Sequence, residues 1–142
     1  MTAQFVLLGL LILTPVGQPP ARANEFAGLF YSIAVLLAVP AVINLRPSLT
    51  VMPEPKTQAP LITYGIYRWI RHPMYTALLC LAMGLAVSHW TVTGFVLVIV
   101  LAVVLTTKSR YEDRLLQQRW QQAQVYQQRT GAFWPRVRRS HR

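Results

Sequence analysis

Long uncharged stretches alternate with short polar connections along the chain. From Met74 to Thr107 there is no Lys, Arg, Asp or Glu in 34 residues. A straight helix of that length would run about 51 Å, which is too long for one crossing of a hydrocarbon core about 30 Å thick. The pattern therefore predicts a helical hairpin that turns near His89-Trp90-Thr91, where an aromatic side chain suits the membrane interface.

Two further apolar runs precede this hairpin. Phe26 to Leu45 predicts a clear crossing, with a kink expected at Pro40. Phe5 to Thr14 is shorter, and Ala21-Arg22-Ala23 after it is similar to a signal-peptidase site, so cleavage of the first run is one interpretation. We favour an uncleaved first helix, because no Lys or Arg precedes Phe5 and an even number of spans puts both termini on one side.

The basic residues predict the orientation of these spans. The first connection holds only Arg22, residues 45–73 hold four Lys or Arg, and the tail from Lys108 holds nine against two acids. Because basic residues mark the cytosolic side, we expect the middle loop, the tail and both termini in the cytosol. Residues 17–25 and the turn at His89 are then expected on the opposite side.

Composition supports the same class of protein, since 54% hydrophobic and 13% charged residues are unusual for a soluble domain of this size. We predict an all-α, polytopic membrane protein with about four transmembrane helices and a cytosolic C-terminal helical extension. It is expected to form a single domain over residues 1–142. Its predicted parts are two N-terminal spans in 1–45, a cytosolic loop in 46–72, a transmembrane hairpin in 73–107, and a cytosolic helix with a basic tail in 108–142.

Proline and glycine predict where helices begin and end. Four prolines between Arg46 and Pro60 disfavour regular helix and suit a crossover along the membrane surface. Pro73 can begin the third span, because the first helical amide has no partner within the helix. After Thr107 there is no Gly or Pro before Gly131, so the fourth helix is expected to continue to about Arg129.

Charge and cysteine content bear on the partners. The formal net charge is +10, but the basic tail contains no recognisable nucleic-acid module and begins at a membrane exit. Anionic lipid headgroups are therefore the expected partner of the tail, and no nucleic acid is expected. The single cysteine, Cys80, excludes an intrachain disulfide and a multi-cysteine zinc site, and no metal site is predicted.

The densest group of chemically useful side chains runs from Tyr64 to Tyr75. Aromatic residues and arginines at a membrane interface are ordinary anchors, so anchoring is one interpretation. The other is a ligand site. Arg71 and His72 would stand at the amino terminus of a helix that begins at Pro73, where unpaired amides and the helix dipole attract an anion.

A second polar cluster, Lys108 to Arg114, holds two of the four acids of the chain, Glu112 and Asp113. Charge balance on a solvated helix is the simpler role, at about 0.3 kcal/mol per pair. The alternative is that the two acids receive a cation or the hydroxyls of a sugar. The same predicted helix carries an apolar stripe that we expect to pack against another part of the protein: Tyr111, Leu115, Leu116, Trp120 and Tyr126.

The order of these features resembles a known superfamily. The Arg71-His72-Pro73-Met74-Tyr75 motif, an uncharged hairpin, the adjacent acids and a final Tyr126 to Pro135 segment follow one another. This order resembles the C-terminal half of the isoprenylcysteine carboxyl methyltransferase and phospholipid methyltransferase superfamily. The resemblance covers Leu61 to Pro135, and the combination of motifs is more specific than either motif alone.

The resemblance implies an integral membrane methyltransferase that uses S-adenosylmethionine and admits a lipophilic substrate from the bilayer. It implies roles for Arg71, His72, Pro73, Tyr75 and Glu112, which match the two motifs. Three positions depart from the usual pattern: Asp113 in place of glutamate, Ile66 in place of proline, and Ala77 in place of glycine. The side chain of Asp113 is one methylene shorter than that of glutamate, which shortens the reach of the second acid.

The chemistry of the cofactor fits these residue types. Arg71 or His72 can hold its carboxylate, and Glu112 with Asp113 can hold its ammonium or ribose. The sulfonium cation is attracted by aromatic faces, for which Tyr67, Tyr75 and Trp69 are candidates. Methyl transfer requires mainly positioning and exclusion of water. The predicted catalytic residues are Arg71 and Glu112, and the predicted cofactor-binding residues are Tyr67, Arg71, His72, Pro73, Tyr75, Glu112 and Asp113.

Two alternatives remain open at this point. One is a reductase-like relative that binds a nicotinamide cofactor, and the other is a non-catalytic membrane or assembly protein. The methyl acceptor is also open, although a prenylated protein would need a cation such as Arg68, Arg110 or Arg119 for its carboxylate. We favour a lipid or small lipophilic acceptor, and we expect the protein in a bacterial inner membrane.

Overall fold

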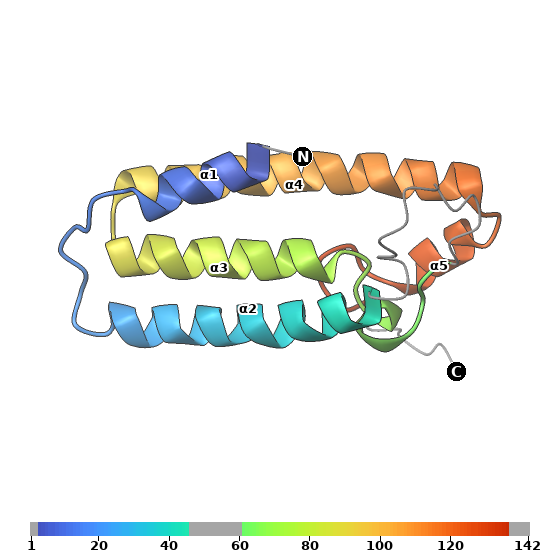
Figure 1. Ribbon diagram of the computed structural model, residues 1–142, viewed down its shortest axis with the longest axis horizontal. Coiled ribbons are helices and arrows are strands. Elements are labelled where there is room, and N and C mark those ends of the chain that lie inside the picture. Colours follow the sequence, from blue (N-terminus) through green and yellow to red (C-terminus); the bar gives the residue numbers. More distant parts are fainter. Residues whose placement is uncertain (1–2, 46–60, 137–142) are drawn as a thin grey trace.

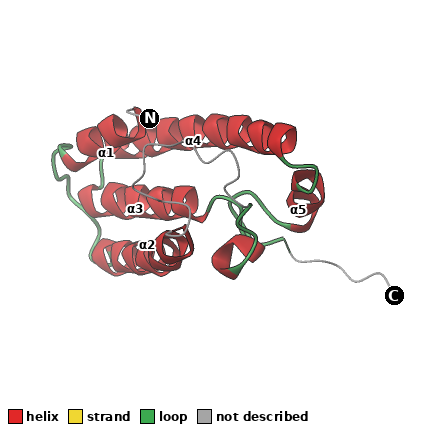
Figure 2. Ribbon diagram, turned by 45° about the vertical axis from the view of Figure 1, so that its right-hand side comes forward, coloured by secondary structure: helices red, strands yellow, loops and turns green. Residues whose placement is uncertain are grey.

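The computed structural model describes residues 3–45 and 61–136, and within these ranges the chain is helical with no strand. This confirms the predicted all-α class (Figure 2). The proline-rich loop predicted between Arg46 and Pro60 and the last residues of the basic tail lie outside the described residues. The helices are α1 (Ala3–Ile12), α2 (Ala23–Leu45), η2 (Gly65–Arg68, a 3₁₀ helix), α3 (Pro73–His89), α4 (Val92–Arg119) and α5 (Ala123–Arg129).

Helices α1 to α4 lie side by side, and α5 folds back at one end (Figure 1). The opposite end holds the α1–α2 connection and the α3–α4 turn. The Gly17 amide donates to the His89 carbonyl at 2.7 Å, and Thr14 Oγ1 lies 2.7 Å from His89 Nδ1. The two connections predicted to share one side of the membrane therefore lie together.

The hairpin is confirmed at the predicted position. Pro73 is the first residue of α3, and Trp90 ends the helix in the left-handed region at φ 49°. Thr91 then caps α4, because its side-chain oxygen accepts a hydrogen bond from the Gly94 amide at 3.2 Å. Aromatic and β-branched side chains thus form the turn in the absence of a glycine at the C-cap.

Two helices, α2 and α4, are long and apolar enough to cross a membrane. A helix of the length of α1 runs about 15 Å and one of the length of α3 about 25 Å, both less than a hydrocarbon core of about 30 Å. Of the described helices, two are therefore candidate spans, and the predicted number of four is not confirmed. Pro40 lies inside α2, where neighbouring helices can satisfy the carbonyl that it leaves unpaired.

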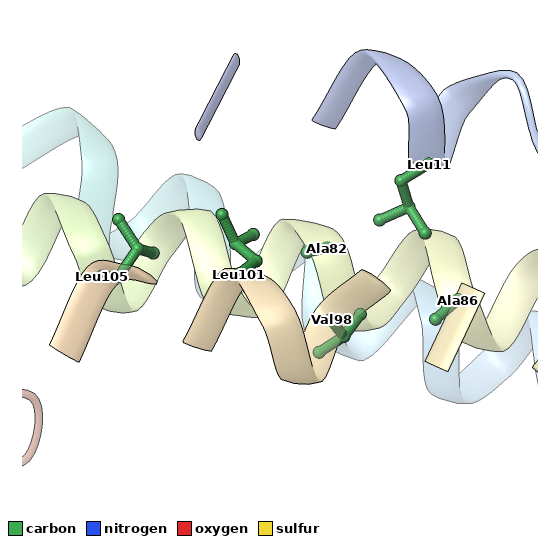
Figure 3. Close-up of a cluster of buried hydrophobic side chains, with 6 residues drawn as sticks. All are labelled: Leu11, Ala82, Ala86, Val98, Leu101 and Leu105. Atoms are coloured by element: carbon green, nitrogen blue, oxygen red, sulfur yellow. The ribbon is translucent and has the colours of Figure 1, made fainter. Parts of the chain in front are cut away.

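The core is built from small and branched apolar side chains between α1, α3 and α4 (Figure 3). Helices α2 and α3 also approach closely, since a Cβ at Gly84 would lie 2.5 Å from a ring carbon of Tyr31. Small residues at helix contacts are typical of membrane bundles, where packing replaces the hydrophobic effect. The main core cluster consists of Leu11, Ala82, Ala86, Val98, Leu101 and Leu105.

The outer faces of the long helices remain apolar. Large side chains repeat about once per turn along α2 and α4 and stay exposed, which suits contact with lipid chains. On α2 these include Phe26, Leu29, Ile33 and Leu36, and on α4 they include Val92, Val96, Ile99 and Val103.

The predicted continuation of the fourth helix to Arg129 is wrong. Helix α4 ends at Arg119, Trp120 adopts an extended conformation at φ −132° and ψ 121°, and α5 begins at Ala123. This reversal lets Tyr126 reach η2, where its hydroxyl donates to the Tyr67 carbonyl at 2.7 Å. Part of the apolar stripe therefore packs as expected, whereas Tyr111 is 63% exposed and does not.

Candidate active site

The segment before α3 is shaped by a glycine and contacts the residues that follow α5. Gly65 has a φ of 62°, and a Cβ at this position would collide with the side chain of Asn44. Ile70 then forms an isolated parallel bridge with Gly131. This bridge brings the segment after α5 alongside the motif that precedes α3.

Backbone hydrogen bonds continue this contact into the first turn of α3. The Arg71 amide donates to the Gly131 carbonyl at 2.9 Å, and the His72 amide donates to the Ala132 carbonyl at 3.0 Å. Thr76 Oγ1 donates to the Phe133 carbonyl at 2.9 Å. Two amides before the helix thus have partners from the C-terminal segment.

The Arg71 guanidinium is bound within the protein. Its Nη1 donates to the carbonyls of Gln127 at 2.6 Å and Thr130 at 3.0 Å, and its Nη2 lies 3.0 Å from Asp113 Oδ2. Its Nε is buried and has no partner among the described residues. Arg71 therefore ties α4 and the α5 segment to the start of α3.

His72 is the N-cap of α3 and lies between the two predicted acids. Its Nε2 is 3.1 Å from Asp113 Oδ1, and its Nδ1 is 3.6 Å from Glu112 Oε2. The imidazole stacks on Tyr75 with ring centres 5.3 Å apart, and the Tyr75 hydroxyl donates to Glu112 Oε1 at 2.6 Å. The two motifs, separated by a hairpin in sequence, thus meet in one cluster.

A cavity of about 490 Å³ opens beside this cluster. That volume is in the range of small-molecule sites. Its polar lining comes from Tyr67, Arg71, His72, Tyr75, Glu112, Arg119 and Tyr126. Its apolar lining comes from Leu45, Leu61, Ile62, Pro73, Met74, Leu115, Leu116 and Trp120.

The predicted site residues divide into two groups. Six of them line the cavity, whereas Asp113 does not line it and instead pairs with Arg71 and His72. Trp69, the third aromatic candidate, is 58% exposed and is absent from the lining. The six lining residues are Tyr67, Arg71, His72, Pro73, Tyr75 and Glu112.

Several lining residues were not among the predicted site residues. Arg119 lies two turns after Glu112 on α4, so helical periodicity could have placed both on one face. Trp120 and Tyr126 belonged to the predicted apolar stripe, but nothing in the sequence located the chain reversal that brings Tyr126 to the cavity. Leu61 and Ile62 carry no chemical signal of their own.

Burial changes the acid–base properties of two tyrosines in this lining. Burial raises the pKa of Tyr126 to about 12, while the nearby Arg71 acts in the opposite direction. Burial also raises the pKa of Tyr67. Both hydroxyls are therefore protonated at neutral pH, so they can donate hydrogen bonds. Among the described residues, no group of three or more His, Cys, Asp or Glu side chains is arranged to hold a metal ion.

Comparison with known proteins identifies the family of the chain. A model of the family described as phospholipid methyltransferase matches residues 24–123. Because the match spans more than half of the chain, the protein belongs to this family, one of the integral membrane methyltransferases, as the motifs predicted. No curated protein and no solved structure matches the chain.

Proposed function

We propose that this protein transfers a methyl group from S-adenosylmethionine to a lipophilic acceptor at the cytosolic face of the membrane. The observation that carries the proposal is that both sequence motifs line one cavity. Its walls combine an acid, cations and aromatic rings with an apolar surface. A charged cofactor and a lipophilic acceptor require polar and apolar lining residues in the same cavity.

The residues of the cavity fit the chemical groups of the cofactor. Glu112 is 34% exposed at its side chain, so its carboxylate is available to an ammonium or to ribose hydroxyls. The rings of Tyr67, Tyr75 and Tyr126 offer aromatic faces to a sulfonium cation. When bound, S-adenosylmethionine would supply a methyl group on a positively charged sulfur.

We assign Arg71 a different role from direct capture of the cofactor carboxylate. Its terminal nitrogens already contact Asp113 and two backbone carbonyls. Releasing them would leave buried polar groups without partners, which is costly. Arg71 therefore positions Asp113 and the C-terminal segment, and through Asp113 it orients His72. The side chains of His72 and Arg119 are then the other nitrogen-bearing groups of the cavity lining that a carboxylate can contact.

The apolar wall supports a lipophilic acceptor. Leu61, Ile62, Leu115 and Leu116 provide a surface on which an acyl or prenyl chain can bury. A cavity of about 490 Å³ is small compared with a cofactor plus a long chain, so the reactive head enters and the chain extends toward the bilayer. Closing the cavity with such a chain would exclude water from the reacting atoms.

An anionic acceptor group would find its partner in Arg119. Of the three cations considered for an acceptor carboxylate, Arg119 lines the cavity. Arg68 instead lies 5.9 Å from the centre of the Trp69 ring. Transfer of a labelled methyl group to extracted lipids, compared with transfer to small thiols, identifies the acceptor.

We further propose an inner-membrane location with both termini in the cytosol. The support is the excess of basic residues in the middle loop and in the tail from Lys108. The same residues would attract anionic lipid headgroups, at about 1 kcal/mol for each Lys or Arg near the membrane surface.

Titration calorimetry on detergent-purified protein tests the proposal. S-adenosylmethionine or its demethylated product, S-adenosylhomocysteine, should bind with a dissociation constant below about 1 mM, the upper end of ordinary Michaelis constants. The absence of heat from either ligand at millimolar concentration would contradict methyl transfer. Binding of NADPH in their place would favour a reductase.

A further inference from the structure

Lys108 lies next to the acidic cluster but is not one of the cavity-lining residues. Its ammonium donates to Gln4 Oε1 at 3.2 Å and lies 4.0 Å from Glu112 Oε1. It also lies 5.1 Å from the centre of the Tyr75 ring. One cation therefore contacts α1, α3 and its own helix α4 at the same time.

These contacts act on one oxygen of Glu112. Oε1 accepts the Tyr75 hydroxyl at 2.6 Å and is the oxygen that faces Lys108, whereas Oε2 faces the His72 ring at 3.6 Å. The arrangement fixes the rotation of the carboxylate. It also gives each acid its own cation, because Arg71 pairs with Asp113 at 3.0 Å.

Gln4 connects this cluster to the first helix. Helix α1 has the sequence AQFVLLGLLI, in which Gln4 is the single polar side chain, and Gln4 is 9% exposed. A buried amide in an apolar helix costs free energy unless it has a hydrogen-bond partner, and Lys108 is that partner. The residues matched by the family begin at residue 24, so α1 lies outside them.

We propose that Lys108, held by Gln4, is a positioning residue of the methyl-transfer site. Lys108 stabilises the hydrogen bond between Tyr75 and Glu112 Oε1, and it leaves Glu112 Oε2 for the ligand. Helix α1 then contributes to the methyl-transfer site through Gln4. This inference rests on the proposed function, because the ligand that it concerns is the methyl donor.

Binding of S-adenosylhomocysteine to the full-length protein in detergent tests the inference. Lys108→Met keeps an unbranched side chain and should weaken binding about tenfold, because it removes the cation beside Glu112 as well as the hydrogen bond to Gln4. Lys108→Arg restores the cation and should return affinity to within about threefold of the wild type. Gln4→Leu should weaken binding by about threefold, because Lys108 keeps its contacts within α3 and α4.

Coupling and control variants separate positioning from folding. The double variant Gln4→Leu with Lys108→Met should bind as Lys108→Met alone does, because both changes act through the same ammonium. Arg114→Met and Gln118→Leu alter exposed residues of α4 and should leave affinity unchanged. Melting of each ligand-free protein reports whether it has folded.

Each outcome decides between the two proposals. Wild-type affinity in folded Lys108→Met and Gln4→Leu overturns the inference and leaves the proposed function intact. Equal weakening by Lys108→Arg and Lys108→Met also overturns it, since the cation would not be the relevant feature. If the wild type binds neither S-adenosylhomocysteine nor S-adenosylmethionine, the proposed function itself fails, and this role of Lys108 fails with it.

Discussion

Helix α3 carries a histidine at each end, and the two differ in their surroundings. His89, its last residue, contacts the Thr14 hydroxyl at 2.7 Å, and its carbonyl accepts the Gly17 amide. These neutral partners close the α1–α2 connection onto the α3–α4 turn. His72, the N-cap, instead lies between the carboxylates of Glu112 and Asp113 and lines the cavity.

The comparison shows that the residue type does not define the site. A histidine at the end of a helix can join two connections or line a cavity. The difference comes from the acidic side chains supplied by α4 and from the cavity beside them. Helix polarity contributes as well, because carboxylates are favoured near the positive amino-terminal end where His72 lies.

The largest expected effect is on stability at the His72 end. Asp113→Ala removes the partner of the Arg71 guanidinium, whose side chain is 13% exposed, and should lower the free energy of unfolding by about 3 kcal/mol. Thr14→Val at the His89 end removes a neutral hydrogen bond and should cost about 1 kcal/mol. Chemical unfolding in detergent measures both, and equal losses would contradict the contrast.

The next effect is on ligand affinity. Glu112→Gln keeps the size of the side chain but removes the charge offered to the ammonium of the cofactor. S-adenosylmethionine binding should fall about a hundredfold, measured by calorimetry. Glu25→Gln, in the first turn of α2 at the opposite end, is the matched control and should bind as the wild type does. Comparable losses in both variants would place the ligand elsewhere.

Replacing each of the two histidines with alanine tests the comparison directly. His72→Ala should weaken binding of S-adenosylhomocysteine about tenfold, because it removes a cavity wall and the group that faces Glu112 Oε2. His89→Ala should leave affinity unchanged while lowering the melting temperature slightly. Wild-type affinity in His72→Ala would show that His72 caps α3 without contributing to ligand binding.

The smallest expected effect is a loss of stability at alkaline pH. Burial raises the pKa of Tyr126 from 10.0 to about 12, so between these values the unfolded chain releases a proton that the folded protein keeps. The contribution is fully present below pH 10 and is lost as pH rises toward 12. Melting curves from pH 9 to 12 should show this slope, and Tyr126→Phe should reduce it. An unchanged slope in the variant would contradict the assignment.

Much of this arrangement could be predicted from local sequence signals. Pro73 marked the start of α3, His89 to Thr91 marked the turn, and the two motifs supplied most of the polar cavity lining. The end of α4 could not be predicted, because no Gly or Pro stands at Trp120 and the reversal depends on contacts with η2.

The partners of the charged side chains Arg71 and Lys108 could not be predicted from the spacing of residues in the sequence either. Arg71 was expected to face a ligand, but its guanidinium contacts Asp113 and carbonyls of the segment that follows α4. Gln4 and Lys108 are 104 positions apart, and no periodicity relates them. Such pairings depend on how helices pack, which a single sequence specifies only through the whole fold.

Photolabelling tests the central claim most directly. Purified protein is irradiated with radiolabelled S-adenosylmethionine and digested, and the labelled peptides are identified by mass spectrometry. Adducts are expected on the aromatic residues that line the cavity, Tyr67, Tyr75, Trp120 and Tyr126, and excess S-adenosylhomocysteine should suppress them. Label confined to Tyr31 and Trp90, near the His89 end, would contradict it.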